Sequence, residues 1–310
     1  MPTAGDGTAD SAATSNRGRS VRAWTIGAEH EVLCKTRRDG YKVEVHRGMA
    51  DMEMWIKTDD GRLYAKHWPG SMTGTEQPPI VLLHDSLGCV ELWRGFPLRL
   101  ARVTGRSVIA YDRLGFGKSD PHPSRLGVDF VRQEARVGFS ALIRQLGVER
   151  FIVFGHSVGG GMAVSIAAAY PDRCCSVITE SAQAFVEDRT LEGIKAAKQQ
   201  FAIPNQLDRL KKYHGDKAQW VLDAWVNVWL SPEFALWSLD EDLAFVRGPV
   251  LAIHGEQDEY GTTRHPERII SLAAGSATFV KLPDCGHVPH REEEHTVLNA
   301  VRAFLGALDS

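Results

Sequence analysis

A serine flanked by glycines, Ser157, stands between an apolar run and a helical pattern. Residues 151–154 are typical of a buried strand, and residues 159–170 are predicted to form a helix with a small-residue face. In this context the sequence Gly-His-Ser-Val-Gly at 155–159 fits a nucleophile elbow, a sharp turn that lifts one side chain clear of a sheet. The three fixed residues recur by chance in about one chain in ten of this length. The rest of the chain must therefore decide between catalysis and a tight turn without chemistry.

Short apolar runs recur along the chain, at residues 80–84, 107–111, 151–154, 176–179, 250–254 and 278–282. Amphipathic helical patterns, such as that at 131–146, lie between most of them, and a β-hairpin is predicted at 55–68 around Asp59-Asp60-Gly61. Apolar strands that alternate with helices predict an α/β fold, with a mostly parallel central sheet and helices on both faces.

Residues 183–243 interrupt this alternation, because they carry helical patterns without a strand. We predict a helical cap there, inserted into a core formed by residues 49–182 and 244–310, at the carboxyl edge of the sheet. Residues 1–48 are predicted to be a disordered extension. Their first 20 residues are rich in Ala, Ser, Thr, Gly and Asp and lack the apolar segment of a secretory signal.

The composition limits the classes of binding partner that we expect. A net charge of -3 predicts no nucleic-acid partner, and no run approaches the roughly 18 apolar residues of a membrane helix, so no membrane partner is expected. Five cysteines without metal-ligand or disulfide spacing predict reduced thiols in a cytoplasmic protein, with no cofactor and no metal. A small-molecule substrate is the expected partner, and the sequence is compatible with a homo-oligomer as well as a monomer.

A serine hydroxyl needs a base to react at neutral pH, and the base needs an orienting acid. Among 12 histidines, His287 is best placed, in the loop after the last predicted strand. His290, three residues on, is the nearest alternative. The acid is expected in the loop after the preceding strand, where we choose Asp258 over Glu256 and Glu259.

Two backbone N–H groups are expected to form an oxyanion hole. One belongs to Val158, directly after the candidate nucleophile, and the other is expected from Ser86, in the loop at residues 84–88. A carboxylate aimed at the oxyanion would oppose catalysis, so we expect the Asp85 side chain to turn away from it.

The chain resembles the α/β-hydrolase superfamily from about Met54 to its end. The matching motifs are residues 84–88, 112–119, 155–159, 255–258 and 286–287. The order Ser157, Asp258, His287 is also that of this superfamily. The resemblance is greatest to cap-bearing serine esterases and meta-cleavage-product hydrolases, and weaker to valacyclovir hydrolase. It implies a Ser-His-Asp triad that works through an acyl-enzyme.

The chain departs from the family pattern in two places. The usual His-Gly of the oxyanion loop is His84-Asp85 here. Valacyclovir hydrolase has an acidic residue after its nucleophile, for an amino group, whereas Val158 stands here, which argues against α-amino-acid esters. The serine nucleophile also argues against haloalkane dehalogenases and epoxide hydrolases, which use aspartate.

The predicted function is therefore hydrolysis of an ester or related acyl bond of a small organic molecule. Two alternatives stay open: a carbon–carbon bond hydrolase with the same triad, and a non-catalytic binding protein that keeps the fold. Trp225 and Trp229 lie four residues apart on one predicted helix face. We expect them to line the pocket and select the substrate, the alternative being packing within the cap.

Overall fold

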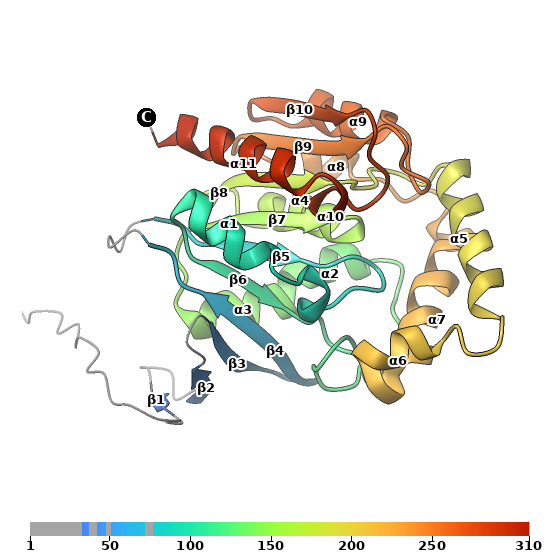
Figure 1. Cartoon of the computed structure of the whole chain (residues 1–310), viewed down its shortest axis with the longest axis horizontal. Helices are drawn as coiled ribbons and strands as arrows, with labels where there is room; N and C mark the ends of the chain where they lie inside the picture. The colour runs from blue at the N-terminus through green and yellow to red at the C-terminus, as the bar shows by residue number, and fades with distance from the viewer. Residues whose placement is uncertain (1–32, 37–41, 48–50, 72–76, 310) are drawn as a thin grey trace, which may run out of the picture. The chain divides into compact units, whose positions relative to one another are not determined.

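The computed structural model describes residues 33–36, 42–47, 51–71 and 77–309. The described strands form one ten-stranded sheet, in the order β1-β2-β3-β4-β6-β5-β7-β8-β9-β10 (Figure 1). The strands are β1 (Leu33–Thr36), β2 (Lys42–Arg47), β3 (Met52–Thr58), β4 (Gly61–Trp68), β5 (Ile80–Leu83), β6 (Val108–Tyr111), β7 (Phe151–His156), β8 (Cys174–Glu180), β9 (Val250–Gly255) and β10 (Ala277–Leu282).

The sheet is antiparallel at one end and parallel over the rest. Strands β1 to β4 pair antiparallel in chain order, and β4 pairs antiparallel with β6. Every other pair is parallel. The hairpin predicted around Gly61 is β3 and β4, and each apolar run contributes a strand near its predicted position. The expected mostly parallel sheet is confirmed.

Helices cover both faces of this sheet (Figure 1). One face carries α1 (Phe96–Thr104) and α11 (Glu294–Leu308), and the other carries α2 (Phe130–Arg136), α3 (Gly138–Leu146) and α4 (Val158–Ala169). Strand β5 shows why the two faces need cover. Ile80 and Leu82 belong to the apolar layer of α1 and α11, whereas Val81 and Leu83 belong to the layer of α2 to α4. A strand buried on both faces is apolar throughout.

The strand order creates a crevice at the centre of the sheet. After β5 the chain winds to β6 on one side, and it then crosses to β7 on the other side of β5. Loops that follow neighbouring strands on opposite sides of such a switch point diverge, and ligands bind between their carboxyl ends. The loop at residues 84–88 and the elbow at Ser157 follow β5 and β7, so both lie at this point.

Between β8 and β9 lie α5 (Asp188–Phe201), α6 (Asp208–His214), α7 (Ala218–Trp229) and α8 (Asp240–Leu243). Helices α5, α6 and α7 lie side by side beyond one end of the sheet (Figure 1). We call residues 183–243 the helical insertion. That it is a separate cap, with the boundaries given above, stays a prediction.

Strands β1 and β2 fall within residues 1–48, for which the sequence predicted disorder. Residues 42–47 alternate apolar and polar positions in part, and β2 pairs with β3, which extends the sheet. For these two strands the prediction is wrong, and residues 1–32, 37–41 and 48 lie outside the described residues.

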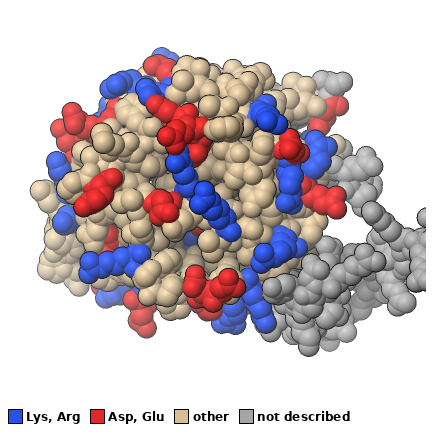
Figure 2. Space-filling view, turned by 180° about the vertical axis from the view of Figure 1, so that it is seen from behind, with Lys and Arg blue, Asp and Glu red and all other residues tan. Residues whose placement is uncertain are grey.

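Within the described part of the chain, no helix is long and apolar enough to span a membrane. Acidic and basic side chains are interspersed over the face in Figure 2.

Candidate active site

Ser157 sits in a strained turn between β7 and α4. Its φ is 56° and its ψ is -126°, a conformation that residues with side chains rarely adopt. The two flanking positions are glycine because neighbouring backbone atoms approach them closely. A Cβ on Gly155 would overlap the Gly159 carbonyl, and a Cβ on Gly159 would overlap the Leu83 carbonyl of β5. The Ser157 N–H donates to the Glu180 carbonyl over 2.8 Å, which ties the turn to the end of β8.

The structure brings Ser157, His287 and Asp258 together. His287 Nε2 lies 3.0 Å from Ser157 Oγ, and His287 Nδ1 lies 2.9 Å from both carboxylate oxygens of Asp258. A carboxylate only accepts hydrogen bonds, so the histidine proton is on Nδ1 and Nε2 is free to accept the serine proton. This is the connectivity that nucleophilic activation requires.

Asp258 is held in place by the backbone of its own loop. Its Oδ1 accepts from the Tyr260 N–H over 2.7 Å and from the Gly261 N–H over 3.2 Å. Burial by itself would raise the pKa of the Asp258 carboxyl. The charge attraction and hydrogen bond of His287 outweigh burial and hold this pKa below its usual range. The carboxyl is therefore ionised when the histidine needs it.

The alternatives weighed from the sequence lie elsewhere. Glu256 and Glu259 are exposed, and Glu256 pairs with Lys281 at the surface. His290 is buried, with its Nδ1 donating to Glu180 over 2.7 Å. None of the three reaches Ser157 by a described hydrogen bond. The catalytic roles of the residues chosen above stay predictions, which the geometry favours.

The predicted oxyanion donors flank the nucleophile. Ser86 lines the same cavity as Ser157 and His287. Val158 is the first residue of α4, where backbone N–H groups have no partner within the helix. The Asp85 carboxylate, which was expected to turn away from the oxyanion, also lines this cavity and has two partners outside the proposed triad. Its Oδ1 accepts from the Leu87 N–H over 2.8 Å, and its Oδ2 faces the His156 ring at 3.3 Å.

A cavity of about 130 Å³ adjoins this group. Its lining comes from the core loops and from α5 and α7: Asp85, Ser86, Leu87, Ser157, Gln183, Thr190, Ile194, Trp225, Trp229, Tyr260 and His287. Trp225 and Trp229 thus both line it. Trp229 is only 2% exposed and also packs against Phe234 and Trp237, with ring centroids 5.1 and 5.6 Å away.

Sequence reasoning missed two residues of this region. Gln183, just after β8, is 3% exposed, and its Oε1 lies 3.4 Å from Ser157 Oγ. His214, at the end of α6, accepts from the Gly117 N–H and contacts the Leu87 carbonyl, both over 2.9 Å. Its Nε2 therefore carries the proton. His214 links the helical insertion to the oxyanion loop. The position of Gln183 directly after a predicted strand could have indicated its place beside Ser157. Nothing in the sequence indicates the contacts of His214.

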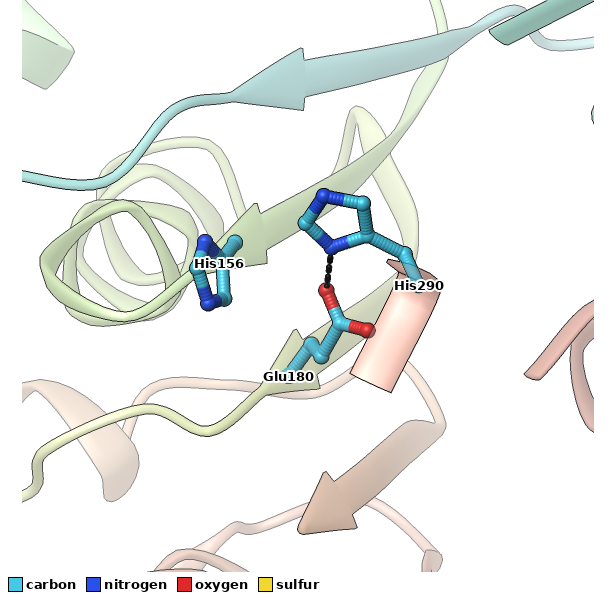
Figure 3. Close-up of side chains that lie close together, drawn as sticks. All are labelled: His156, Glu180 and His290. Carbon is cyan, nitrogen blue, oxygen red and sulfur yellow. Dashed lines mark hydrogen bonds and ion pairs between the residues drawn. The ribbon is translucent and has the colours of Figure 1, made fainter. Parts of the chain in front are cut away.

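His156, Glu180 and His290 form a buried cluster beneath the elbow (Figure 3). Among the described residues this is the group whose potential metal-ligand atoms come together, all within 4.8 Å. Most of these polar atoms have partners, although Glu180 Oε1 accepts no described hydrogen bond. His290 Nδ1 donates to Glu180, and the His156 ring contacts the His287 carbonyl and the Asp85 carboxylate. Only His290 and Glu180 are joined by a hydrogen bond, and His156 lies beside them with its ring 5.0 Å from that of His290, so we assign no metal to the cluster.

Comparison with known proteins identifies the fold and its family. A family described as "alpha/beta hydrolase fold" matches residues 78–221. The chain is 25% identical over 253 residues to a 2-hydroxy-6-oxo-2,4-heptadienoate hydrolase of Pseudomonas putida. This alignment covers 74% of this chain and 90% of that protein. It is 26% identical over 255 residues to the sn-1-specific diacylglycerol lipase ABHD11 of Mus musculus, covering 74% and 81%.

A solved structure of proline iminopeptidase from Mycobacterium smegmatis superposes with a TM-score of 0.64 at 23% identity. It covers 83% of this chain and 98% of that one. The expected α/β-hydrolase fold is therefore confirmed, and the comparisons support a hydrolase. The names of these three proteins point to different substrates, so similarity does not choose the bond that is cleaved.

Proposed function

Because the chain belongs to the α/β-hydrolase superfamily, we propose that it is a serine hydrolase that cleaves an ester or related acyl bond of a small organic molecule. One observation carries the proposal: the unbroken series of contacts from Ser157 Oγ through the His287 ring to the Asp258 carboxylate. A binding protein needs no such series, whereas acyl transfer requires every part of it.

The reaction follows from the positions of the protons. His287 Nε2 takes the Ser157 proton as Oγ attacks the acyl carbon, and the ionised Asp258 stabilises the imidazolium that forms. The N–H groups of Ser86 and Val158 hold the oxyanion. His287 then returns the proton to the leaving oxygen, which departs as an alcohol and leaves an acyl-enzyme on Ser157. Water, deprotonated by His287, attacks the acyl carbon, the bond to Ser157 Oγ breaks as His287 returns the proton to Oγ, and the acid is released.

The cavity indicates a short or compact acyl group. Its volume is about 130 Å³, and an apolar cavity of roughly 150 Å³ holds benzene. Apolar side chains of α5 and α7 form much of the wall, among them Ile194 and Trp225. We therefore expect acetyl to butyryl or benzoyl esters to be preferred over long-chain esters.

The direct test is hydrolysis of p-nitrophenyl acetate by the purified protein and by Ser157→Ala and His287→Ala. Each variant should lower kcat by roughly 10⁴–10⁶ while the fold, followed by circular dichroism, survives. Ser271→Ala is the matched control, since Ser271 is exposed and lies outside the cavity. Either triad variant within about tenfold of the wild type, with contaminating esterase excluded, refutes the assignment.

A second candidate function is cleavage of a carbon–carbon bond. It is favoured by the Pseudomonas putida relative, whose 2-hydroxy-6-oxo-2,4-heptadienoate hydrolase aligns with this chain over 90% of its length. The two functions separate in one experiment, in which the protein receives either p-nitrophenyl acetate or a 2-hydroxy-6-oxo-dienoate. Turnover of the dienoate alone, lost in Ser157→Ala, assigns the carbon–carbon reaction. Binding of either compound without turnover assigns a non-catalytic receptor.

A further inference from the structure

A mostly buried group of polar side chains adjoins the proposed triad. Asp85 is the neighbour of the oxyanion donor Ser86, and His156 is the neighbour of the nucleophile. Glu180 carries the carbonyl that accepts the Ser157 N–H, and His290 lies three residues after His287. The two histidines and Glu180 are at most 4% exposed. This group of side chains therefore adjoins the oxyanion loop, the elbow and the loop of His287.

His156 is the centre of this group, and both of its ring nitrogens face oxygen atoms. Nε2 lies 2.8 Å from the His287 carbonyl, which can only accept, so Nε2 carries a proton. Nδ1 lies 3.3 Å from Asp85 Oδ2, a carboxylate whose pKa is held far below its usual range, chiefly by its interactions with His156, even though burial opposes this. A proton on Nδ1 satisfies that carboxylate. The arrangement is that of a doubly donating imidazolium cation.

We propose that Asp85 and His156 are positioning residues: their ion pair, which is buried on the His156 side and partly exposed on the Asp85 side, joins the oxyanion loop to the loop of the catalytic histidine through the His287 backbone carbonyl. This inference deepens the proposed function and rests on it. The Asp85 end fixes the segment that presents the Ser86 N–H, because Asp85 Oδ1 also accepts from Leu87. The His156 end fixes the peptide from which the His287 ring projects.

Burying even one charge is costly, and the His156 side chain is 2% exposed while that of Asp85 is 31% exposed, so the pair has to be explained. An uncharged pair of similar size would fill this space without a desolvation penalty. A charged pair does fix direction, since each donor has one acceptor and a shift of either loop leaves a charge unpaired. Glu180 adds a fully buried carboxylate beside His156. The hydrogen-bond partner of Glu180, His290, packs at a tilt against Trp93 with ring centroids 4.6 Å apart.

The pair makes activity depend on pH on the alkaline side. Burial by itself would lower the pKa of His156, but the Asp85 hydrogen bond and the Glu180 charge outweigh burial and raise the pKa to about 9. Loss of the proton above this value leaves one of the two contacts unmade. The titratable side chains that face His156 are those of Asp85, Glu180, His287 and His290. A cavity of about 50 Å³ beside His156 is also lined by His84, Cys89 and Arg291.

The test is the pH profile of kcat/KM for p-nitrophenyl acetate between pH 7 and 10.5, corrected for spontaneous hydrolysis. The wild type should lose activity with a midpoint near pH 9, reaching roughly a tenfold loss one unit above it. Asp85→Asn keeps the Oδ1 acceptor for Leu87, and its amide donates to Nδ1, so His156 is neutral and still donates to the His287 carbonyl. In this variant the alkaline loss should fall below about twofold.

His156→Leu removes both donors. It should lower kcat by about 100-fold with little change in KM, because the nucleophile and base are misplaced while the cavity is intact. His295→Gln, at an exposed position of α11, is the matched control and should keep the wild-type profile. Because His156→Leu could unfold the protein, the rate of Ser157 labelling by a fluorophosphonate is measured on the fraction that is folded.

The outcomes distinguish failure of the positioning role from failure of the proposed function. An active wild type with no alkaline loss, or the same loss in Asp85→Asn, overturns the positioning role and leaves the proposed function standing. A kcat of folded His156→Leu within about threefold of the wild type also overturns it. A wild type that neither hydrolyses the ester nor is labelled refutes the proposed function, and the inference falls with it.

Discussion

Replacing Asp258 by asparagine tests the proposed triad most sharply, because the loop leaves the new side chain one orientation. In the wild type, Oδ1 accepts from the N–H groups of Tyr260 and Gly261. An asparagine must keep its oxygen there, since turning the amide round would aim its NH₂ group at two N–H donors. The NH₂ group then takes the place of Oδ2, 2.9 Å from His287 Nδ1, beside the retained oxygen, which is equally close.

This reverses the proton pattern of the histidine. An NH₂ group beside Nδ1 favours the tautomer in which Nδ1 accepts, and the proton then lies on Nε2, the atom that is 3.0 Å from Ser157 Oγ in the wild type. A protonated Nε2 cannot take the serine proton. The expected loss in kcat is about 10⁴-fold, which corresponds to about 5 kcal/mol of transition-state stabilisation.

The assay is steady-state hydrolysis of p-nitrophenyl acetate at pH 8, with thermal unfolding recorded for each variant. Glu256→Gln is the control, because Glu256 is an exposed carboxylate of the same loop that pairs with Lys281. An exposed pair contributes little, so its loss should change kcat less than about twofold. If Asp258→Asn keeps its activity within about tenfold, or Glu256→Gln is the more damaging change, the assignment of the acid is wrong.

Two further predictions concern the cavity and the buried acid beneath it. Trp225→Ala or Trp229→Ala should shift the preferred acyl length in a series of p-nitrophenyl esters without abolishing hydrolysis. An unchanged ranking in folded variants would assign these rings to packing alone, and unfolding must be checked because truncating a buried tryptophan costs about 3–5 kcal/mol. Burial by itself would raise the pKa of Glu180, but the charge and hydrogen bond of His290 hold it below its usual value. Its contribution to stability is therefore present above the unfolded value of about 4.3 and lost as pH falls through the folded value. The melting temperature should drop on acidification below about pH 4.5, and the drop should be smaller in Glu180→Gln; equal drops would contradict this role.

The parts of this protein that are visible in its sequence are those that local chemistry specifies. Runs of apolar residues predict buried strands wherever they occur, and the glycines around Ser157 predict a turn that other residues cannot make. The close approach of Gly159 to the β5 backbone is the physical reason for that signal. The strand-to-loop positions of Asp258 and His287 could be predicted for the same reason, since each follows a strand directly.

Tertiary structure decided which side chains of those loops meet. Asp258 and Glu256 stand two residues apart, and only the turn fixed by the Tyr260 and Gly261 amides points one inward and the other to solvent. The network of His156 and Glu180 has no local signal at all. Its contacts join residues 131 and 110 positions apart along the chain. Such contacts depend on the packing of separate strands, and that packing sets which charges are buried together.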